Sequence, residues 1–480
     1  MIDNIRQKYN NIPLRIRASM WFFICSLMQK AVSVVSTAVF TRLMSTEDYG
    51  LISIYNSWSD IFMIVASLNL AVGCFNVGMT RFEGDQKHWV SSLQILSVIS
   101  ASIFTFFFLG SYNLWCGYIG LPFETILVMG VTFFTIPALN LWTANQRFQC
   151  SYQKLIAVSM LYSVGVFISS LISVVCFDNK GIAKIYATAG ITIVVGGVLL
   201  ISNLKAERPV INRGYVKFAT KYNLQMMPAF LATVLLNQID RVMIDHMVGR
   251  SSVAIYSVAY NAAYMISIVS SAINATYNPW LMKRVKNDNY ENTNKIGITI
   301  TAFLLIVIFG FIFCAPEFVK IIASEEYYEA IYIIPAVAAS TFFSLIYTLY
   351  CPIAQYYLKA KELAFVTVVS AILNVLLNYV AINKYGYIAA GYTTYICYLI
   401  YGWGTGIYCI YLLKKNGIKA EIYDGKKLVM LTIILSVATI MAPFLYDGYW
   451  VRYLLLVCII LFLAFSGKRY FKLFSDIRKG

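Results

Sequence analysis

Residues 15–50 read RIRASMWFFICSLMQKAVSVVSTAVFTRLMSTEDYG. Arg15 and Arg17 precede an apolar run of about 23 residues, which is long enough to cross the hydrocarbon core of a bilayer as one helix. The run lacks a small-x-small cleavage site, so we expect it to be retained and not removed as a signal peptide. A short polar turn follows, and a second apolar run begins at once. This arrangement is typical of a helical protein that crosses a membrane many times.

The composition extends this interpretation to the whole chain of 480 residues. Hydrophobic residues make up 60% and charged residues only 12%, against about 25% charged residues in soluble proteins. The polar stretches are too short for a separate catalytic or nucleotide-binding domain of about 100 to 200 residues. We predict fourteen membrane spans near 18–40, 51–74, 89–110, 125–146, 155–176, 184–204, 222–246, 252–280, 296–315, 329–351, 363–382, 386–413, 428–445 and 449–466.

The distribution of basic residues predicts the topology. The net charge is +16, and placing the N-terminus in the cytoplasm puts 29 Lys and Arg residues on the cytoplasmic side and seven on the outer side. Acidic residues show no such asymmetry, as the positive-inside rule expects. We therefore predict that both termini are cytoplasmic, and we attribute the positive charge to topology and not to a nucleic-acid partner.

The first residues allow two interpretations. Ile2, Ile5, Tyr9 and Ile12 recur at helical spacing among basic residues, which predicts a short interfacial helix over 1–17 that binds membrane lipids. The alternative is a disordered basic tail, because Pro13 and neighbouring asparagines disfavour a helix.

The sequence contains no pattern for a metal site or for ATP. Only two histidines occur, no Cys-x-x-Cys is present, and no G-x-x-x-x-G-K-[ST] sequence is found. We expect no metal and no cofactor. Because no ATP site is present, any process that this chain drives would have to use an ion gradient, of H+ or Na+.

A weak internal repeat connects the two halves. An offset of 205 residues aligns DYGLISIYN (48–56) with VAIYSVAYN (253–261), so that Tyr55-Asn56 matches Tyr260-Asn261. Both segments lead into an even-numbered span. Two parallel six-helix halves would be related by an axis along the membrane normal, and transporters commonly bind substrate where such halves meet.

Two segments carry a resemblance to a known family. TRLMSTEDYG, in which Arg42, Asp48, Tyr49 and Gly50 are the characteristic residues, resembles the turn after the first helix of the Wzx-type O-antigen and polysaccharide flippases. These flippases belong to the multidrug/oligosaccharidyl-lipid/polysaccharide exporter superfamily. The second segment starts at Pro228, continues through Asp240-Arg241, and ends in AIYSVAY (254–260), where Tyr256 and Tyr260 match the family. A glycine common in the family before this tyrosine is replaced by Ala254-Ile255.

The resemblance implies a fold and a function. The fold is an all-α polytopic membrane protein with two six-helix lobes, a pseudo-two-fold axis along the membrane normal and two further C-terminal helices. The expected parts are an N-terminal segment 1–17, an N-lobe 18–204, a cytoplasmic loop 205–221, a C-lobe 222–413, and spans 13 and 14 with a basic tail in 414–480.

The implied function is that of a transporter and not an enzyme. It moves an undecaprenyl-diphosphate-linked oligosaccharide across the bacterial inner membrane by alternating access, for O-antigen (lipopolysaccharide) or capsule assembly. Polymerase and chain-length proteins of the same pathway are the implied partners. The alternatives are a cation-coupled multidrug exporter or a lipid II flippase of the same superfamily. A membrane glycosyltransferase or polymerase would need a large outer loop, and the longest outer stretch has about a dozen residues.

Charged residues inside spans are candidates for the transport site, because a charge at mid-bilayer costs about 3 kcal/mol or more. Lys30 and Asp60 have similar depths on consecutive antiparallel spans, so we expect them to pair. Two hypotheses stay open: a structural ion pair, or a site in which Lys30 meets the lipid diphosphate and Asp60 orients it.

Span 7 carries a second set of polar residues. Asn237, Arg241 and Asp245 follow each other at intervals of four, with Asp240 beside them, so they form one stripe that we expect to face a cavity. We predict that Asn237 and Arg241 bind substrate and that the acidic residues serve charge pairing or ion coupling. The alternative is that Arg241 pairs with Asp245 at the outer interface and reaches water.

Three prolines lie inside predicted spans. Pro137, Pro228 and Pro335 each remove a backbone hydrogen bond and bend the helix, so they are hinge candidates. A static kink is the alternative for each.

Overall fold

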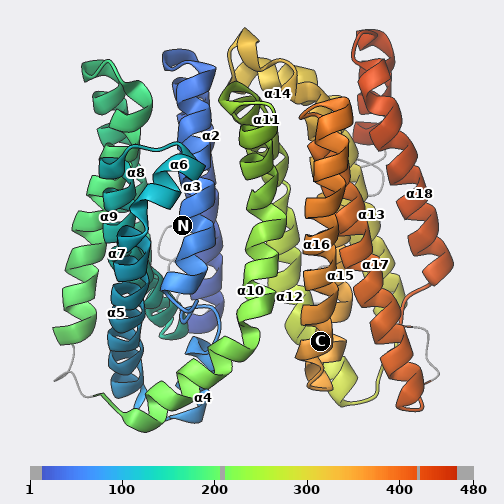
Figure 1. Ribbon diagram of the computed structural model, residues 1–480. Coiled ribbons are helices and arrows are strands. Elements are labelled where there is room, and N and C mark those ends of the chain that lie inside the picture. The colour runs from blue at the N-terminus through green and yellow to red at the C-terminus, as the bar shows by residue number, and fades with distance from the viewer. Residues whose placement is uncertain (1–12, 206–210, 419–421, 462–480) are drawn as a thin grey trace, which may run out of the picture. The chain divides into compact units, whose positions relative to one another are not determined.

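The computed structural model describes residues 13–205, 211–418 and 422–461, and in these ranges every regular element is a helix. The chain divides into two compact units, 1–234 and 235–480 (Figure 1). We call them unit 1 and unit 2 and describe each by itself. The boundary between them falls inside one long helix, α10.

Unit 1 consists of eight helices and the first part of α10. Their bounds are α2 (Leu14–Leu43), α3 (Thr46–Ala66), α4 (Phe75–Arg81), α5 (Gln86–Gly110), α6 (Tyr112–Ile119), α7 (Phe123–Phe148), α8 (Tyr152–Cys176), α9 (Lys180–Lys205) and α10 (Arg213–Met247).

Unit 2 contains the rest of α10 and the helices that follow it. These are α11 (Arg250–Tyr264), α12 (Ser267–Lys286), α13 (Thr293–Phe313), α14 (Ala315–Ile322), η1 (Glu325–Tyr327), α15 (Ala330–Tyr356), α16 (Ala360–Tyr385), α17 (Ala389–Lys415), α18 (Gly425–Met441), η2 (Ala442–Leu445) and a final apolar helix, Tyr449–Leu461.

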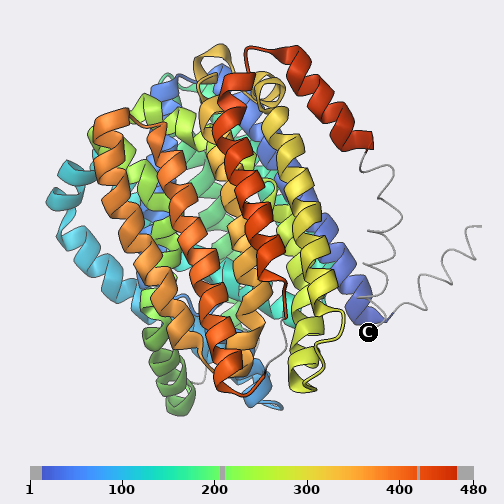
Figure 2. The same ribbon diagram turned by 90° about the vertical axis from the view of Figure 1, so that its right-hand side faces the viewer.

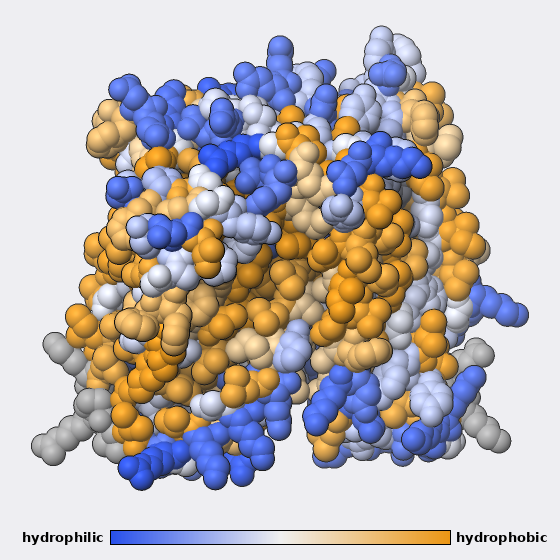
Figure 3. Space-filling view, in the orientation of Figure 1, coloured by the Kyte–Doolittle hydropathy of each residue, from blue (hydrophilic) through white to orange (hydrophobic). Residues whose placement is uncertain are grey.

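The helices confirm the predicted all-α membrane fold. Twelve of them are long and apolar enough to cross a bilayer, with α11 and α12 counted as one span of 37 residues. The two other predicted spans correspond to α3 and to the shorter helix Tyr449–Leu461. Hydrophobic side chains cover the middle of the helices, and hydrophilic side chains gather at the helix ends (Figure 3). The protein is therefore a multi-pass membrane protein.

Two boundaries differ from the prediction. The segment 205–221, predicted as a loop, is partly helical, because α10 begins at Arg213. Its first turns are stabilised by Tyr215 and Phe218, which pack in the core of unit 1 and not in lipid. The second span ends at Ala66, because Leu68 and Asn69 adopt positive φ angles that a helix does not allow. The predicted interfacial helix lies almost entirely in residues 1–12, outside the described ranges.

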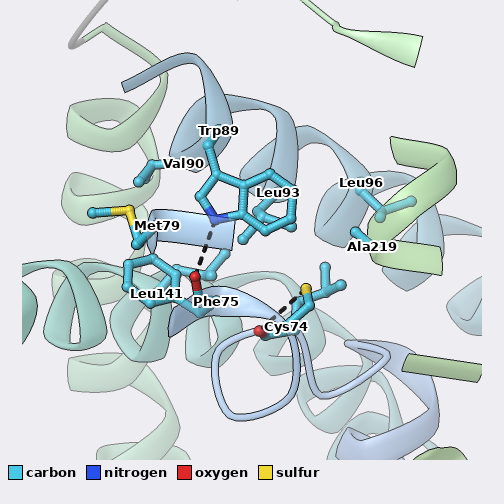
Figure 4. Packing of buried hydrophobic residues seen from close by; sticks show 10 residues of the cluster. Cys74, Phe75, Met79, Trp89, Val90, Leu93, Leu96, Leu141 and Ala219 are labelled. Carbon is cyan, nitrogen blue, oxygen red and sulfur yellow. Dashed lines mark hydrogen bonds between the residues drawn. The ribbon is translucent and has the colours of Figure 1, made fainter. Parts of the chain in front are cut away.

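The core of unit 1 is organised around Trp89 on α5 (Figure 4). The Trp89 side chain is fully buried, and its Nε1–H donates a hydrogen bond of 3.2 Å to the carbonyl of Phe75. A Cβ added to Gly78 would lie 2.1 Å from the indole ring. Only glycine therefore allows α4 to approach α5 this closely. Ala219 of α10 completes the cluster.

The core of unit 2 is organised around α15, the most deeply buried span. It packs most extensively against α17. Gly402 allows this approach, because a Cβ there would lie 2.6 Å from the carbonyl oxygen of Phe343 on α15. In unit 1, α7 and α9 pack in the same way, and a Cβ added to Gly196 would lie 2.5 Å from the carbonyl oxygen of Thr135.

The aligned residues of the internal repeat have matching environments. Tyr55 and Tyr260 are each 7% exposed, and the asparagines that follow them, Asn56 and Asn261, are exposed. The aligned residues therefore match in burial, and the repeat relation between the two halves stays a prediction.

The last described helix borders an apolar cavity of about 560 Å³ in unit 2. The cavity is lined by α13, α18 and Tyr449–Leu461, including Phe309, Val437 and Leu455. Figure 2 shows the final helix, in the darkest red, turning away from the end of α18. Arg452 anchors it by donating to the carbonyl of Phe313 at 3.0 Å and to the Glu317 carboxylate at 2.9 Å.

Candidate functional site

Asp240 on α10 is the most deeply buried acidic side chain in the described part of unit 2, with no exposed surface. Three side chains donate hydrogen bonds to its carboxylate. The Tyr256 hydroxyl and the Thr394 hydroxyl reach Oδ2 at 2.5 and 2.7 Å, and the Asn378 amide reaches Oδ1 at 2.5 Å. Donors from three other helices, α11, α16 and α17, thus converge on one buried carboxylate.

A second layer of polar groups surrounds these donors. Asn374, one turn before Asn378 on α16, donates to Thr394 at 3.3 Å and accepts from the Asn378 amide at 3.3 Å. Thr393 donates to Asn378 Oδ1. Asn374, Asn378 and Thr394 are all fully buried. Buried polar groups inside a membrane protein are costly unless they form hydrogen bonds, and here each of these groups has a hydrogen-bond partner.

Arg241 is buried beside the carboxylate, with 6% of its surface exposed. Its Nε donates to the Ser257 hydroxyl at 3.1 Å, and one terminal nitrogen donates to the carbonyl of Asn237 at 2.8 Å and to Gln238 at 2.9 Å. Its guanidinium carbon lies 4.5 Å from the centre of the Tyr260 ring. Arg241 is thus held inside unit 2 by hydrogen bonds and by a cation–π contact.

The stripe predicted on span 7 faces the interior of unit 2. The side-chain oxygen of Asn237 accepts hydrogen bonds from Tyr260 at 2.8 Å and from Tyr398 at 2.9 Å. Asp245, nearer the end of α10, lies 3.8 Å from Arg250. Asp245 thus pairs with Arg250 and not with Arg241. Arg241 bonds to Asn237, and the two lie beside the hydrogen-bonded group around Asp240.

The motif TRLMSTEDYG has a local role at a helix junction in unit 1. Asp48 accepts a hydrogen bond of 3.1 Å from the backbone N–H of Gly181, in the first turn of α9, and a second of 2.8 Å from the Ser45 hydroxyl. The Lys180 ammonium donates to the carbonyl of Leu43 at 2.7 Å. A carboxylate at a helix N-terminus is favourable. Asp48 thus fastens the start of α3 to the start of α9.

The neighbouring motif residues complete this junction. Tyr49 and Gly50 are buried, whereas Arg42 is exposed and donates to the carbonyl of Ala38 at 2.7 Å. The ammonium of Lys184 lies 3.6 Å from the centre of the Phe40 ring and 5.4 Å from that of Tyr49.

The other predicted site residues are placed as follows. Lys30 is partly buried on α2 and Asp60 is exposed on α3, and their pairing stays a prediction. Pro137, Pro228 and Pro335 lie inside α7, α10 and α15, as predicted, and their role as hinges stays a prediction. In the described residues, no group of three or more His, Cys, Asp or Glu side chains forms a metal site.

Six of these hydrogen-bonding residues were not singled out from the sequence: Gln238, Asn374, Asn378, Thr393, Thr394 and Tyr398. A signal was present, because Asn374 and Asn378 are two amides one turn apart in the otherwise apolar segment VVSAILNVLLNYVAI. An amide inside a span needs a buried partner, and its spacing identifies the face on which to look.

Comparisons with known proteins agree with this architecture. The sequence model described as polysaccharide biosynthesis protein matches residues 16–285, more than half of the chain, and the MatE model matches residues 226–380. A search among curated proteins finds no match.

Solved structures share the fold at low sequence identity. The lipid II flippase MurJ, in an inward closed conformation, is 13% identical with a TM-score of 0.67, over 94% of this chain and 99% of its own. An inward-facing MATE family multidrug transporter is 13% identical with a TM-score of 0.62, over 82% and 96%. A transporter of the same superfamily from Pyrococcus furiosus is 14% identical with a TM-score of 0.56, over 84% and 95%.

Proposed function

Because the chain belongs to the polysaccharide biosynthesis protein family, a family of the multidrug/oligosaccharidyl-lipid/polysaccharide exporter superfamily, we propose that it is a flippase for a lipid-linked oligosaccharide. The cargo is an undecaprenyl-diphosphate-linked glycan, moved from the cytoplasmic to the outer leaflet of the bacterial inner membrane. The protein is a transporter and not an enzyme. The family match over residues 16–285 is the observation that carries this proposal.

Ion coupling at Asp240 is the second part of the proposal. A buried carboxylate binds either a proton or a small hard cation, and oxygen atoms are the ligands that such cations prefer. Asp240 offers two carboxylate oxygens, and Thr394 and Asn374 bring a hydroxyl and an amide oxygen to the same network. Filling or emptying this site would change the hydrogen bonds between α10, α11, α16 and α17, and so bias the packing of unit 2.

Two basic residues have different roles in this proposal. Arg241 is fixed inside unit 2, so we assign it to the electrostatic balance of Asp240 and not to direct contact with the diphosphate. Lys30 on α2 is only partly buried, and it stays the proposed partner of the diphosphate, with Asp60 setting its orientation. The apolar cavity beside α13 and α18 suits a hydrocarbon chain, since its lining side chains are almost all apolar.

The topology and partners belong to the same proposal. Both termini lie in the cytoplasm, in agreement with the 29 to 7 distribution of basic residues. Polymerase and chain-length proteins of the same pathway would receive the glycan on the outer side.

Reconstituted vesicles test the proposal. The purified protein would be given a fluorescent polyprenyl-diphosphate oligosaccharide, with a proton or a sodium gradient imposed separately, and leaflet exchange would be followed by quenching with an impermeant reagent. We expect exchange that depends on one of the two gradients. Exchange of a lipophilic drug cation but not of the glycolipid would instead support the multidrug exporter, and exchange of lipid II alone would support the lipid II flippase.

A further inference from the structure

The polarity of the exposed side chains on a membrane-spanning helix indicates whether that side of the helix faces lipid or water. Between residues 158 and 175 of α8, the exposed side chains follow helical spacing and are all aliphatic: Leu161, Val164, Ile168, Ile172 and Val175, at 41 to 71% exposure. Between residues 362 and 382 of α16, the exposed side chains are likewise apolar apart from one tyrosine, Tyr379. Such faces suit contact with lipid.

The span formed by α11 and α12 exposes side chains of a different kind. From residue 261 to residue 276, the exposed side chains among those that the structure describes are Asn261, Tyr264, Ser271, Asn274 and Thr276, and none of these is aliphatic. Asn261 and Tyr264 lie on α11, and Ser271 and Asn274 lie on α12. The two members of each pair are three residues apart, so they share one face of their helix. We call these four residues the polar face of unit 2.

Depth places the α11 part of this face, Asn261 and Tyr264, inside the membrane. Tyr264 lies fourteen residues after Arg250, where the span begins, which is about 21 Å along a helix that rises 1.5 Å per residue. The hydrocarbon core is about 30 Å thick. Exposed amides and hydroxyls at this depth would be costly against lipid, so this part of the polar face borders water.

The ring of Tyr264 is a prearranged platform. It stacks on Tyr260 with ring centres 6.0 Å apart and an interplanar angle of 17°. Tyr260 is in turn fixed by its hydrogen bond to Asn237 and by the guanidinium of Arg241 over its ring. Tyr264 itself is 43% exposed. An exposed ring held by buried neighbours loses little conformational entropy when a ligand packs on it.

The chemistry of the polar face selects one class of ligand. No charged side chain lies between residues 261 and 276, so the face offers nothing specific to a diphosphate or to a drug cation. An aromatic ring packs against the C–H face of a sugar ring, and amide and hydroxyl groups both donate to and accept from sugar hydroxyls. We infer that the polar face of unit 2, with Tyr264 as its platform, binds neutral sugar rings of the glycan.

This inference rests on the proposed function but concerns a different site from Asp240. Its test uses the full chain in lipid nanodiscs and a neutral N-acetylated disaccharide as the probe, with saturation-transfer difference NMR to detect weak binding. The variants are Tyr264→Phe, which keeps the ring, and Tyr264→Leu, which removes it. Tyr379→Leu is the matched control, because Tyr379 is 62% exposed on an apolar face of the same unit.

We expect signals from the wild type, Tyr264→Phe and Tyr379→Leu, and a loss of at least tenfold for Tyr264→Leu. Equal signals from the wild type and Tyr264→Leu would overturn the inference and leave the flippase proposal standing. Loss in Tyr264→Phe would also overturn it, since the ring would then not be the binding element. No signal from the wild type would overturn the inference, and the vesicle assay with the intact glycolipid would decide separately whether the flippase proposal also fails.

Discussion

Unit 1 and unit 2 share a packing plan but use their buried polar residues differently. In both units a glycine brings two spans into close contact, Gly196 in unit 1 and Gly402 in unit 2. Unit 2 adds a carboxylate, Asp240, at the centre of four helices. The offset of 205 residues aligns Asp240 with Val35, an exposed apolar residue of α2. In unit 1 the acidic residue of the repeat segment, Asp48, instead fastens a helix junction.

This difference teaches that a repeat preserves packing more readily than chemistry. Close packing needs only small residues at the crossing point, whereas a buried carboxylate needs several donors at once, and any one missing donor makes it costly. The following predictions test the assignment of ion coupling to unit 2 and of structural roles to unit 1.

The largest effect is expected at Asp240. Asp240→Asn removes the charge but keeps a side chain that hydrogen-bonds, so we expect near-normal protein level and a loss of gradient-driven transport of at least about tenfold, equivalent to about 1.4 kcal/mol. Asp245→Asn is the control on the same helix, because Asp245 is partly exposed and lies beside Arg250. Similar rates of gradient-driven transport by both variants would contradict the assignment of ion coupling to Asp240.

The second prediction concerns the charges of unit 1. Lys30→Ala and Asp60→Ala are each expected to lower protein level or export severely, because a charge left alone in a span costs several kcal/mol. The double variant Lys30→Met, Asp60→Leu separates two roles. Recovery of both protein level and surface glycan would indicate a structural pair, and recovery of level without export would indicate that Lys30 contacts the diphosphate. A double variant less abundant than the two single effects combined would refute the pairing.

The third prediction compares the two glycine contacts. Gly196→Ala and Gly402→Ala each place a Cβ about 2.5 to 2.6 Å from a backbone carbonyl oxygen, so both should lower the melting temperature in detergent, at an overpacking cost of about 1 to 3 kcal/mol. Gly190→Ala and Gly310→Ala are the controls, since an added Cβ meets nothing within 4 Å at either position. A large decrease in melting temperature for only one of the two variants would contradict the proposal that the two units pack in the same way.

A smaller effect is expected at the junction of unit 1. Asp48→Ala removes the hydrogen bonds to Gly181 and Ser45, and we expect a loss of about 1 to 2 kcal/mol in stability with transport largely retained. Glu47→Ala tests the neighbouring exposed carboxylate, which should have little effect. A normal melting temperature with abolished transport would show instead that the motif acts in transport.

The smallest effect concerns the final helix of unit 2. Burial raises the pKa of Glu317, but hydrogen bonds from Arg452, from the backbone and from Tyr453 outweigh it and hold the pKa below its usual value. The stabilisation from the Glu317–Arg452 ion pair is therefore fully present above the usual pKa of a glutamate, about 4.3. It is lost as the pH falls through the lowered pKa of Glu317. Because Glu317 is partly exposed, solvent weakens this contribution.

A spin label at Cys458, in a chain whose other cysteines are replaced, measures the mobility of this helix. We expect mobility to rise only in strong acid in the wild type. Glu317→Gln should raise it already at neutral pH and remove the dependence on pH. A mobility that does not respond to Glu317→Gln would mean that apolar contacts alone hold the helix.

The sequence by itself determined the number and position of the spans, because hydropathy over about 20 residues is a local property and lipid imposes it on each helix separately. It also indicated the repeat, the family, and three residues of the buried network, Asn237, Asp240 and Arg241. The alternation of basic residues indicated the topology, which stays a prediction.

Only the tertiary structure decided what those residues contact. Asp240 meets Asn378 and Thr394 across 138 and 154 residues of chain, and Asp48 meets Gly181 across 133. Helical spacing fixes which residues share a face of one helix, but not which face of another helix lies opposite. That choice depends on the packing of several helices together, through contacts such as Gly402 against Phe343. A single sequence does not contain the pairing as a local pattern.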